Sequence, residues 1–347
     1  MKFFSGLIAI VVLASLFLCA PLRGVADAKT YTIKVTHVFN ATHAWNRGLE
    51  RFKVLVEKRT GGNLKVKIYP AAQLSGGNNR TMCEQLQAGT LEMLVHSPLS
   101  WAGLVPEPQL FDLPFLYPNT ETALEVTNMS ESLDFMNKYF GPLNVTTISV
   151  WENGFRYLTN SKRPVRTPED MEGLKIRIPP TPLLIDEYER MGALPVSIPM
   201  AELYTSLQQG TVDGQENSIA AINSNRLFEV NKYITLWRYC WDPGVVQLNT
   251  KFMQSLPEDL RKILVETAVE VGKEVNALIA KEDKEFLEIF KQKGCEIITL
   301  TDEETEAFSK LLAPTFDKFI PQFGGAEAYE TLKKNIESAS KKVAQKQ

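Results

Sequence analysis

Residues 30–70 read TYTIKVTHVFNATHAWNRGLERFKVLVEKRTGGNLKVKIYP and decide the fold class of the chain. Apolar and polar residues alternate over residues 30–38, which is typical of a half-buried strand. Apolar residues then recur at helical spacing over residues 45–56, and a pair of glycines ends this amphipathic helix. Residues 64–69 indicate a second strand, which stops at a proline. A strand, a helix and a strand in this order predict an α/β domain with a largely parallel sheet.

The same alternation starts again near residue 145 and indicates a second α/β domain. Its predicted strands cover residues 145–150 and 175–178 and a segment that begins at Val212, and its predicted helices cover residues 182–191, 201–209 and 218–228. A chain of 347 residues also suits two domains better than one core. Because no low-complexity linker separates the halves, we expect the domains to exchange strands.

A single long helix is predicted in the C-terminal third. Residues 255–258, Ser-Leu-Pro-Glu, have the pattern of a capping box with proline in the first turn. The apolar stripe that follows continues to Gly294. At 1.5 Å per residue such a helix is about 55 Å long, so we expect it to run across both domains. Residues 301–304 predict the capped start of a further helix.

The composition argues against several classes of function. The chain has 38 Lys and Arg residues against 41 Asp and Glu residues, so nothing favours binding to a phosphate backbone. There is no GxSxG elbow, no GxGxxG or Walker loop, no zinc-ligand spacing and no visible base–nucleophile pair for a secreted hydrolase. Of the three histidines, His37 could face a ligand, whereas we interpret His43 as a surface group and His96 as a packed group. We therefore expect a protein that is not an enzyme and uses no cofactor, metal or nucleic acid.

The N-terminus predicts export. An apolar run over residues 7–20 is too short to span a bilayer comfortably, and residues 26–28 are Ala-Asp-Ala. These features match a secretory signal peptide cleaved after Ala28, and they predict a periplasmic protein. The alternatives are an uncleaved anchor, or a lipoprotein modified at Cys19, although Leu18 stands where a small residue is expected. Three widely spaced cysteines remain, and they favour buried thiols over a disulfide: Cys83, Cys240 and Cys295.

Arg177 is the candidate ligand-binding residue that the local pattern indicates most clearly. It lies at the C-terminal end of a predicted strand that Pro179 stops, and ligands of open α/β sheets gather beyond such ends. A guanidinium there can bind a carboxylate through two parallel hydrogen bonds. The alternative is a surface arginine that pairs with Glu172 or Asp170.

Three motifs around this arginine carry a family resemblance. They are Asn153-Gly154-Phe155-Arg156, Gly173-Leu174-Lys175-Ile176-Arg177-Ile178-Pro179 and Asp213-Gly214-Gln215-Glu216-Asn217. In this order they resemble the substrate-binding proteins of TRAP transporters, the DctP family, and the likeness extends from Lys29 to about Phe323. The resemblance implies a periplasmic-binding-protein-like α/β fold, in which two lobes joined by crossing strands and a long helix close on a small organic acid.

The resemblance also implies roles for individual residues. Arg177 corresponds to the arginine that forms a salt bridge with the ligand carboxylate, Asn217 to an asparagine that helps to hold it, and Arg156 to a second arginine near the ligand. We expect the two arginines to form one local positive site. The implied pocket walls, which vary with the substrate, are Phe39, Ser97, Thr181, Met200 and Tyr239. Ser97 and Met200 differ from the residues of sialic-acid-binding members, which argues against that ligand.

The lobes and partners are predicted on the same basis. Lobe I is expected over residues 29–153 and 243–282, and lobe II over residues 154–242 and 283–347. The implied partners are a small-molecule carboxylate and the small and large membrane subunits of a TRAP permease, and we expect a monomer. The alternative function is a ligand-dependent sensor that presents its closed form to a signalling receptor.

Overall fold

The computed structural model describes residues 29–345, and within them nine strands form one mixed sheet. The predicted signal peptide lies outside the described residues. The strands are β1 (Tyr31–Thr36), β2 (Leu64–Tyr69), β3 (Met93–His96), β4 (Val145–Asn160), β5 (Lys175–Ile178), β6 (Leu194–Ser197), β7 (Gly214–Asn217), β8 (Tyr233–Asn249) and β9 (Glu296–Thr299). Their order is β2-β1-β3-β8-β4-β7-β5-β6, with β9 paired to β8. Parallel strands at both ends of this order confirm the predicted α/β class.

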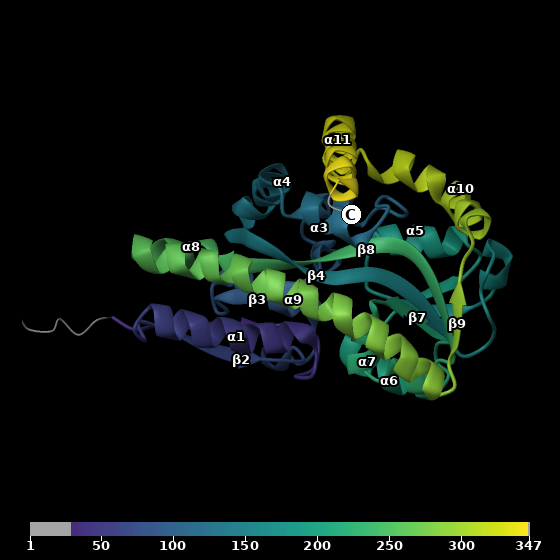
Figure 1. Ribbon diagram of the computed structural model, residues 1–347, viewed down its shortest axis with the longest axis horizontal. Helices are drawn as coiled ribbons and strands as arrows, with labels where there is room; N and C mark the ends of the chain where they lie inside the picture. Colours follow the sequence, from purple (N-terminus) through teal and green to yellow (C-terminus); the bar gives the residue numbers. More distant parts are fainter. Residues whose placement is uncertain (1–28, 346–347) are drawn as a thin grey trace, which may run out of the picture.

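Helices pack around this sheet (Figure 1). Within residues 29–345 they are α1 (Ala44–Arg59), α2 (Asn79–Ala88), α3 (Thr120–Thr127), α4 (Ser130–Phe140), α5 (Pro182–Arg190), α6 (Met200–Gln208), α7 (Ile219–Ser224), α8 (Thr250–Ser255), α9 (Glu258–Gln292), α10 (Asp302–Phe319) and α11 (Gly325–Ala344). The apolar stripe predicted for the first helix is buried in α1, at Trp45, Leu49, Phe52 and Val56. Burial of this stripe orients the helix, as expected for an amphipathic sequence.

Two long antiparallel strands, β4 and β8, join the lobes and confirm the predicted crossing strands. They pair from Val145 opposite Asn249 to Asn160 opposite Tyr233. β8 pairs with β9 near its start and with β3 near its end, so it belongs to both lobes. The sequence predicts only residues 145–150 of this pair as strand, because buried polar residues interrupt the apolar pattern farther along.

Helix α9 crosses the molecule beside the long strands (Figure 1). Its 35 residues make it about 52 Å long, and it packs against α1 and β4. This confirms the predicted long helix, but the predicted capping box at its start is wrong. Ser255 is still part of α8, and its hydroxyl donates to the carbonyl of Phe252 at 2.7 Å. The second predicted capping box, Thr301 with Glu304, forms at the start of α10.

The last two helices pack against different lobes. Helix α10 packs against α5, whereas α11 packs against α3 and contributes Leu332 and Ala339 to the hydrophobic core around Met136 and Phe140. The lobe boundaries stay a prediction; α11, which they assign to lobe II, packs against α3, which they assign to lobe I. All three cysteines of the described part are free and buried, as the sequence favoured.

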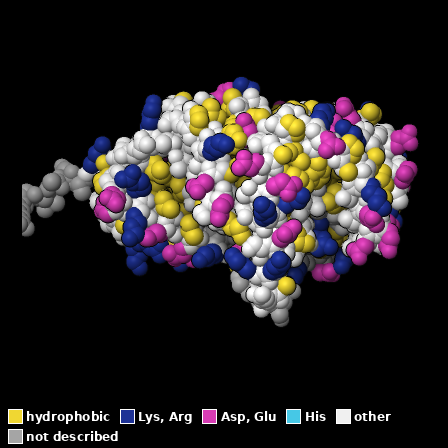
Figure 2. Space-filling view, turned by 90° about the horizontal axis from the view of Figure 1, so that it is seen from above, with side chains coloured by type: hydrophobic (Ala, Val, Ile, Leu, Met, Phe, Trp, Pro, Cys, Tyr) yellow, Lys and Arg dark blue, Asp and Glu magenta, His cyan; other side chains and the backbone are white. Residues whose placement is uncertain are grey.

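The surface carries charges of both signs. On the face shown in Figure 2, Lys and Arg side chains are interspersed with Asp and Glu side chains. This face therefore offers no extended basic surface to a polyanion. Within residues 29–345, no helix is both long and apolar enough to cross a membrane.

Candidate functional site

A small cavity lies where the two lobes meet, and most of the predicted ligand-binding residues surround it. Its volume is about 30 Å³. Six of the eight predicted residues line it: Arg177, Arg156, Asn217, Phe39, Ser97 and Met200. Phe39 and Ser97 follow β1 and β3 of the first lobe, whereas Arg177 and Asn217 lie at the ends of β5 and β7 of the second. The cavity is thus at the carboxyl ends of parallel strands, where α/β sheets bind their ligands.

Arg177 is buried with only part of its hydrogen-bonding capacity satisfied. Its strand lies between β6 and β7, and the side chain is 1% exposed. Nε donates to the carbonyl of Ile198 at 2.7 Å, and Nη1 has no partner among the described residues. Burial lowers the pKa of Arg177 to about 10, although the nearby carboxylate of Glu216 opposes this shift. The alternative of an exposed arginine in a surface ion pair is therefore wrong, because the side chain points into the protein.

Arg156 is also buried, but two carboxylates already neutralise it. Gly154 has φ +108° at a bulge between β4 and β8, a conformation that favours glycine, two residues before Arg156. Nε and Nη2 of Arg156 donate to the carboxylate of Glu216, Nη2 also donates to the carbonyl of Glu216 at 3.1 Å, and Nη1 donates to Asp242. One N–H group of the guanidinium remains for another partner. With Arg177, these groups sum to no net charge, which differs from the predicted positive site.

Two further acids are buried near this cluster. Neither carboxyl oxygen of Asp112 has a partner within the described part of the chain, and Glu187 accepts a hydrogen bond from the hydroxyl of Tyr239. Burial raises the pKa of both acids well above the usual range, and the carboxylates of Asp242 and Glu216 reinforce the shifts. Burial therefore favours the neutral form of both acids.

Thr181 and Tyr239 are not among the residues that line this cavity, and their role as pocket walls stays a prediction. The hydroxyl of Thr181 donates to the side chain of Gln109, and that of Tyr239 donates to Glu187. Tyr239 packs against Trp237 in the core of the second lobe. These contacts hold both side chains behind the cavity wall.

The three histidines all occupy buried positions. His37 lies outside the cavity lining, and its Nε2 donates to Oδ1 of Asn46 at 3.2 Å; burial lowers its pKa to about 4. His43, predicted at the surface, instead caps α1 by accepting the backbone N–H of Trp45 at 3.2 Å. His96 lines the cavity, and neither of its ring nitrogens has a partner among residues 29–345. Burial, helped by His37, lowers the pKa of His96 to about 3, so its ring is neutral.

Several other cavity residues escape sequence reasoning. The additional lining residues are Val38, Trp45, Asn79, His96, Leu99, Ser100, Asn153, Pro179 and Asp242. Arg177 was predicted as a site residue because it lies near the end of a strand. His96 lies at the end of β3, so the same reasoning could have predicted His96 as well. Asp242 lies inside a long strand and Trp45 on the buried stripe of a helix, so neither had a local signal.

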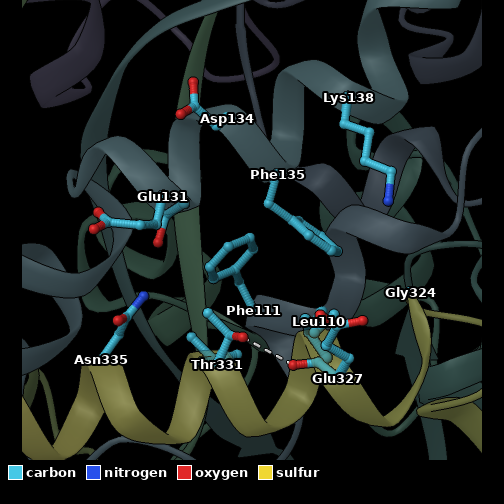
Figure 3. A pocket seen from close by; sticks show the side chains of 13 residues that line it. Leu110, Phe111, Glu131, Asp134, Phe135, Lys138, Gly324, Glu327, Thr331 and Asn335 are labelled. Atoms are coloured by element: carbon cyan, nitrogen blue, oxygen red, sulfur yellow. Dashed lines mark hydrogen bonds between the residues drawn. The ribbon is translucent and has the colours of Figure 1, made fainter.

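A larger hollow of about 360 Å³ lies outside this site, between α4 and α11 (Figure 3). Phe111 and Phe135 line its middle, and four charged side chains surround them: Glu131, Asp134, Glu327 and Lys138. Three acids against one lysine do not favour a carboxylate ligand. Within residues 29–345, no group of three or more His, Cys, Asp or Glu side chains could hold a metal ion.

The fold and the cavity define a class of protein. Two lobes joined by crossing strands and a spanning helix enclose a buried arginine that has no ion-pair partner within residues 29–345, which is the arrangement of a two-lobed solute-binding protein. The model of the bacterial extracellular solute-binding proteins, family 7 (DctP), matches residues 35–322. The chain belongs to this family, as the three motifs predict, and it is a binding protein and not an enzyme.

Known relatives support this assignment over most of the chain. The 2,3-diketo-L-gulonate-binding periplasmic protein YiaO of Escherichia coli is 33% identical over 275 residues, which cover 79% of this chain and 83% of the relative. The C4-dicarboxylate-binding periplasmic protein DctP of Rhodobacter capsulatus is 30% identical over 301 residues, 86% of this chain and 89% of the relative. A TRAP periplasmic solute-binding protein of Ralstonia eutropha, solved with bound (S)-2-acetolactate, superposes with a TM-score of 0.84 at 30% identity, covering 88% of this chain and 99% of that one.

Proposed function

We propose that this protein captures a small organic acid between its two lobes through Arg177 and delivers it to the small and large membrane subunits of a TRAP permease. The observation that carries the proposal is the buried Nη1 group of Arg177, which has no partner among the described residues. Burying such a cation is costly unless an anion pairs with it. The relatives support an acid ligand, since they are named for a sugar acid and C4-dicarboxylates, and the related structure holds 2-acetolactate.

Both lobes contribute residues to the cavity, and this arrangement explains how ligand binding would favour closure. A carboxylate held by Arg177 and Asn217 of the second lobe is also enclosed by Phe39 and Ser97 of the first. The ligand therefore binds the closed arrangement more tightly than an open one, and this difference in affinity shifts the protein towards closure. The closed protein, a periplasmic monomer freed of its signal peptide, then docks on the permease. None of the reported relatives favours the sensor alternative.

The test is to identify the ligand and then to remove its anchor. Mass spectrometry of the denatured, freshly purified protein would identify a co-purified acid, and calorimetric titration after refolding would give its affinity. We expect Arg177→Met to weaken binding at least about 30-fold, because truncation leaves a buried carboxylate unpaired. Arg226→Met is the matched control, since Arg226 lies in the same lobe with its side chain 71% exposed. Unchanged affinity in Arg177→Met would contradict the proposal.

A further inference from the structure

The hydrogen-bond pattern of the cavity points to a ligand with a single carboxylate, an inference that rests on the proposed function. Of its lining residues, Arg156 and Arg177 are cations and Asp242 is an anion. Glu216 and Asp242 already pair with Arg156. The first ligand carboxylate can pair with Arg177, but a second would be buried without a cation of its own. An unpaired buried carboxylate is strongly disfavoured.

A neutral polar group faces the cavity from the other lobe. His96 is 2% exposed at the end of β3, and both its ring nitrogens lack a partner among the described residues. A neutral imidazole carries one N–H donor and one acceptor nitrogen. It can donate to a hydroxyl or oxo oxygen and accept from a hydroxyl, but it supplies no positive charge for a carboxylate.

The surroundings of His96 indicate that the ligand satisfies this ring. The neighbouring Ser97 uses its hydroxyl to accept the backbone N–H of Leu99 at 3.2 Å, so it is engaged within its own turn. The other lining residues near the first lobe include the apolar Val38, Phe39, Trp45 and Leu99 and the polar Asn79 and Ser100. The buried Oδ1 of Asn79 also has no partner among the described residues. Buried polar groups in folded proteins normally have hydrogen-bond partners. A ring with none inside a ligand cavity is therefore a recognition element.

We propose that the ligand carries one carboxylate, held by Arg177, and a neutral hydroxyl or oxo oxygen that is recognised by His96. His96 is then a specificity-determining residue that separates hydroxy and oxo acids from plain fatty acids. Dicarboxylates are separated from the same ligands because Arg177 is the one lining arginine without an ion-pair partner among the described residues. This assigns to the site a hydroxy or oxo monocarboxylate of small size.

The experiment uses matched pairs of acids on the full mature protein. Calorimetric titration compares lactate and pyruvate with propionate, and 2- and 3-hydroxybutyrate with butyrate, with succinate and malate as dicarboxylates and the co-purified acid as reference. We expect a hydroxy or oxo acid to bind at least about tenfold more tightly than its parent, and more tightly than either dicarboxylate. His96→Phe should abolish this preference, so that each hydroxy or oxo acid binds no more tightly than its parent acid. His96→Gln, which keeps a donor and an acceptor, should retain part of it.

The possible outcomes separate this inference from the proposed function. If Arg177→Met loses every acid while His96→Phe leaves the preference intact, the role of His96 is refuted and the carboxylate anchor stands. An equal loss for all acids in His96→Phe would mean that the ring only supports the cavity or a water. A dicarboxylate that binds as tightly as the best monocarboxylate overturns the single-carboxylate inference. Failure of the wild-type protein to bind any of these acids contradicts both proposals. Circular dichroism and thermal melting check that each variant is folded.

Discussion

Arg156 and Arg177 are buried to nearly the same extent, with exposures of 3% and 1%, yet their surroundings are opposite. Arg156 lies between Glu216 and Asp242, which accept most of its N–H groups. Arg177 donates to one backbone carbonyl, and its Nη1 has no partner among the described residues. Removing one partner of a buried ion pair is strongly destabilising, whereas a buried charge without a partner gains from pairing with an external anion. The comparison therefore distinguishes an arginine held by its own protein from the one that we propose binds the ligand.

The largest effect is expected from removing the paired arginine. Arg156→Met leaves Glu216 and Asp242 buried without their cation, so the free energy of unfolding should fall by about 3–5 kcal/mol. Urea denaturation followed by circular dichroism measures this loss. Adding Asp242→Asn to the same variant should recover part of it, because one unpaired charge is then removed. A single variant as stable as the wild type would show that the ion pairs contribute nothing.

Removing Arg177 should mainly change the stabilisation by ligand, whereas removing Arg156 should mainly change the stability of the ligand-free protein. Without ligand, Arg177→Met should cost much less stability than Arg156→Met, because Arg177 forms no ion pair among the described residues. With the identified acid at 100 times its dissociation constant, the wild type should gain about 2.7 kcal/mol and the variant nothing. Thermal melting with and without the acid measures both effects. A variant that is destabilised as much as Arg156→Met without ligand would place Arg177 with Arg156 as a structural residue.

Two buried acids near the junction of the lobes, Glu152 and Asp283, should make the stability of the protein depend on pH. Burial raises the pKa of Glu152 to about 8, reinforced by Asp283, and burial raises that of Asp283 to about 7, reinforced by Glu282. The folded protein holds these protons at pH values where the unfolded chain has released them. Unfolding free energy should therefore fall as the pH rises from about 5 through 8, by up to about 1.4 kcal/mol per pH unit for each group. Urea denaturation between pH 5 and 9 measures the slope, and Glu152→Gln with Asp283→Asn should flatten it. An unchanged slope in that double variant would contradict these assignments.

The smallest effect is expected for Thr181 and Tyr239, two predicted pocket walls that are not among the residues lining the cavity. Thr181→Val and Tyr239→Phe each remove a buried hydrogen bond outside the cavity, so each should cost about 1 kcal/mol of stability. Calorimetry should show an affinity for the acid within twofold of the wild type. Asn217→Ala is the control inside the cavity and should weaken binding. If Tyr239→Phe loses affinity for the acid while Thr181→Val does not, Tyr239 contributes to ligand binding and this prediction is contradicted.

Sequence patterns predicted those parts of the fold that depend on neighbouring residues. The periodicity of residues 45–56 predicted α1, and the strand stopped by Pro179 predicted β5 with Arg177 near its end. The long strand β8 was missed, because polar residues such as Asp242 interrupt its apolar pattern while being buried. The same limit explains why His96 was interpreted as a packed group: its burial was foreseen, but not the cavity beside it.

The sequence by itself determined the α/β class, the family, the spanning helix and the position near a strand end of Arg177, the proposed carboxylate anchor. These depend on periodicity, turn residues and short motifs, which act over a few neighbouring positions. Only the tertiary structure decided which arginine is neutralised and which remains unpaired. Arg156 meets Glu216 and Asp242 across separations of 60 and 86 residues, and no local pattern records such pairings. Which arginine is available to a ligand therefore depends on the folded sheet, because burial and pairing between residues far apart in the sequence determine the charge in the cavity.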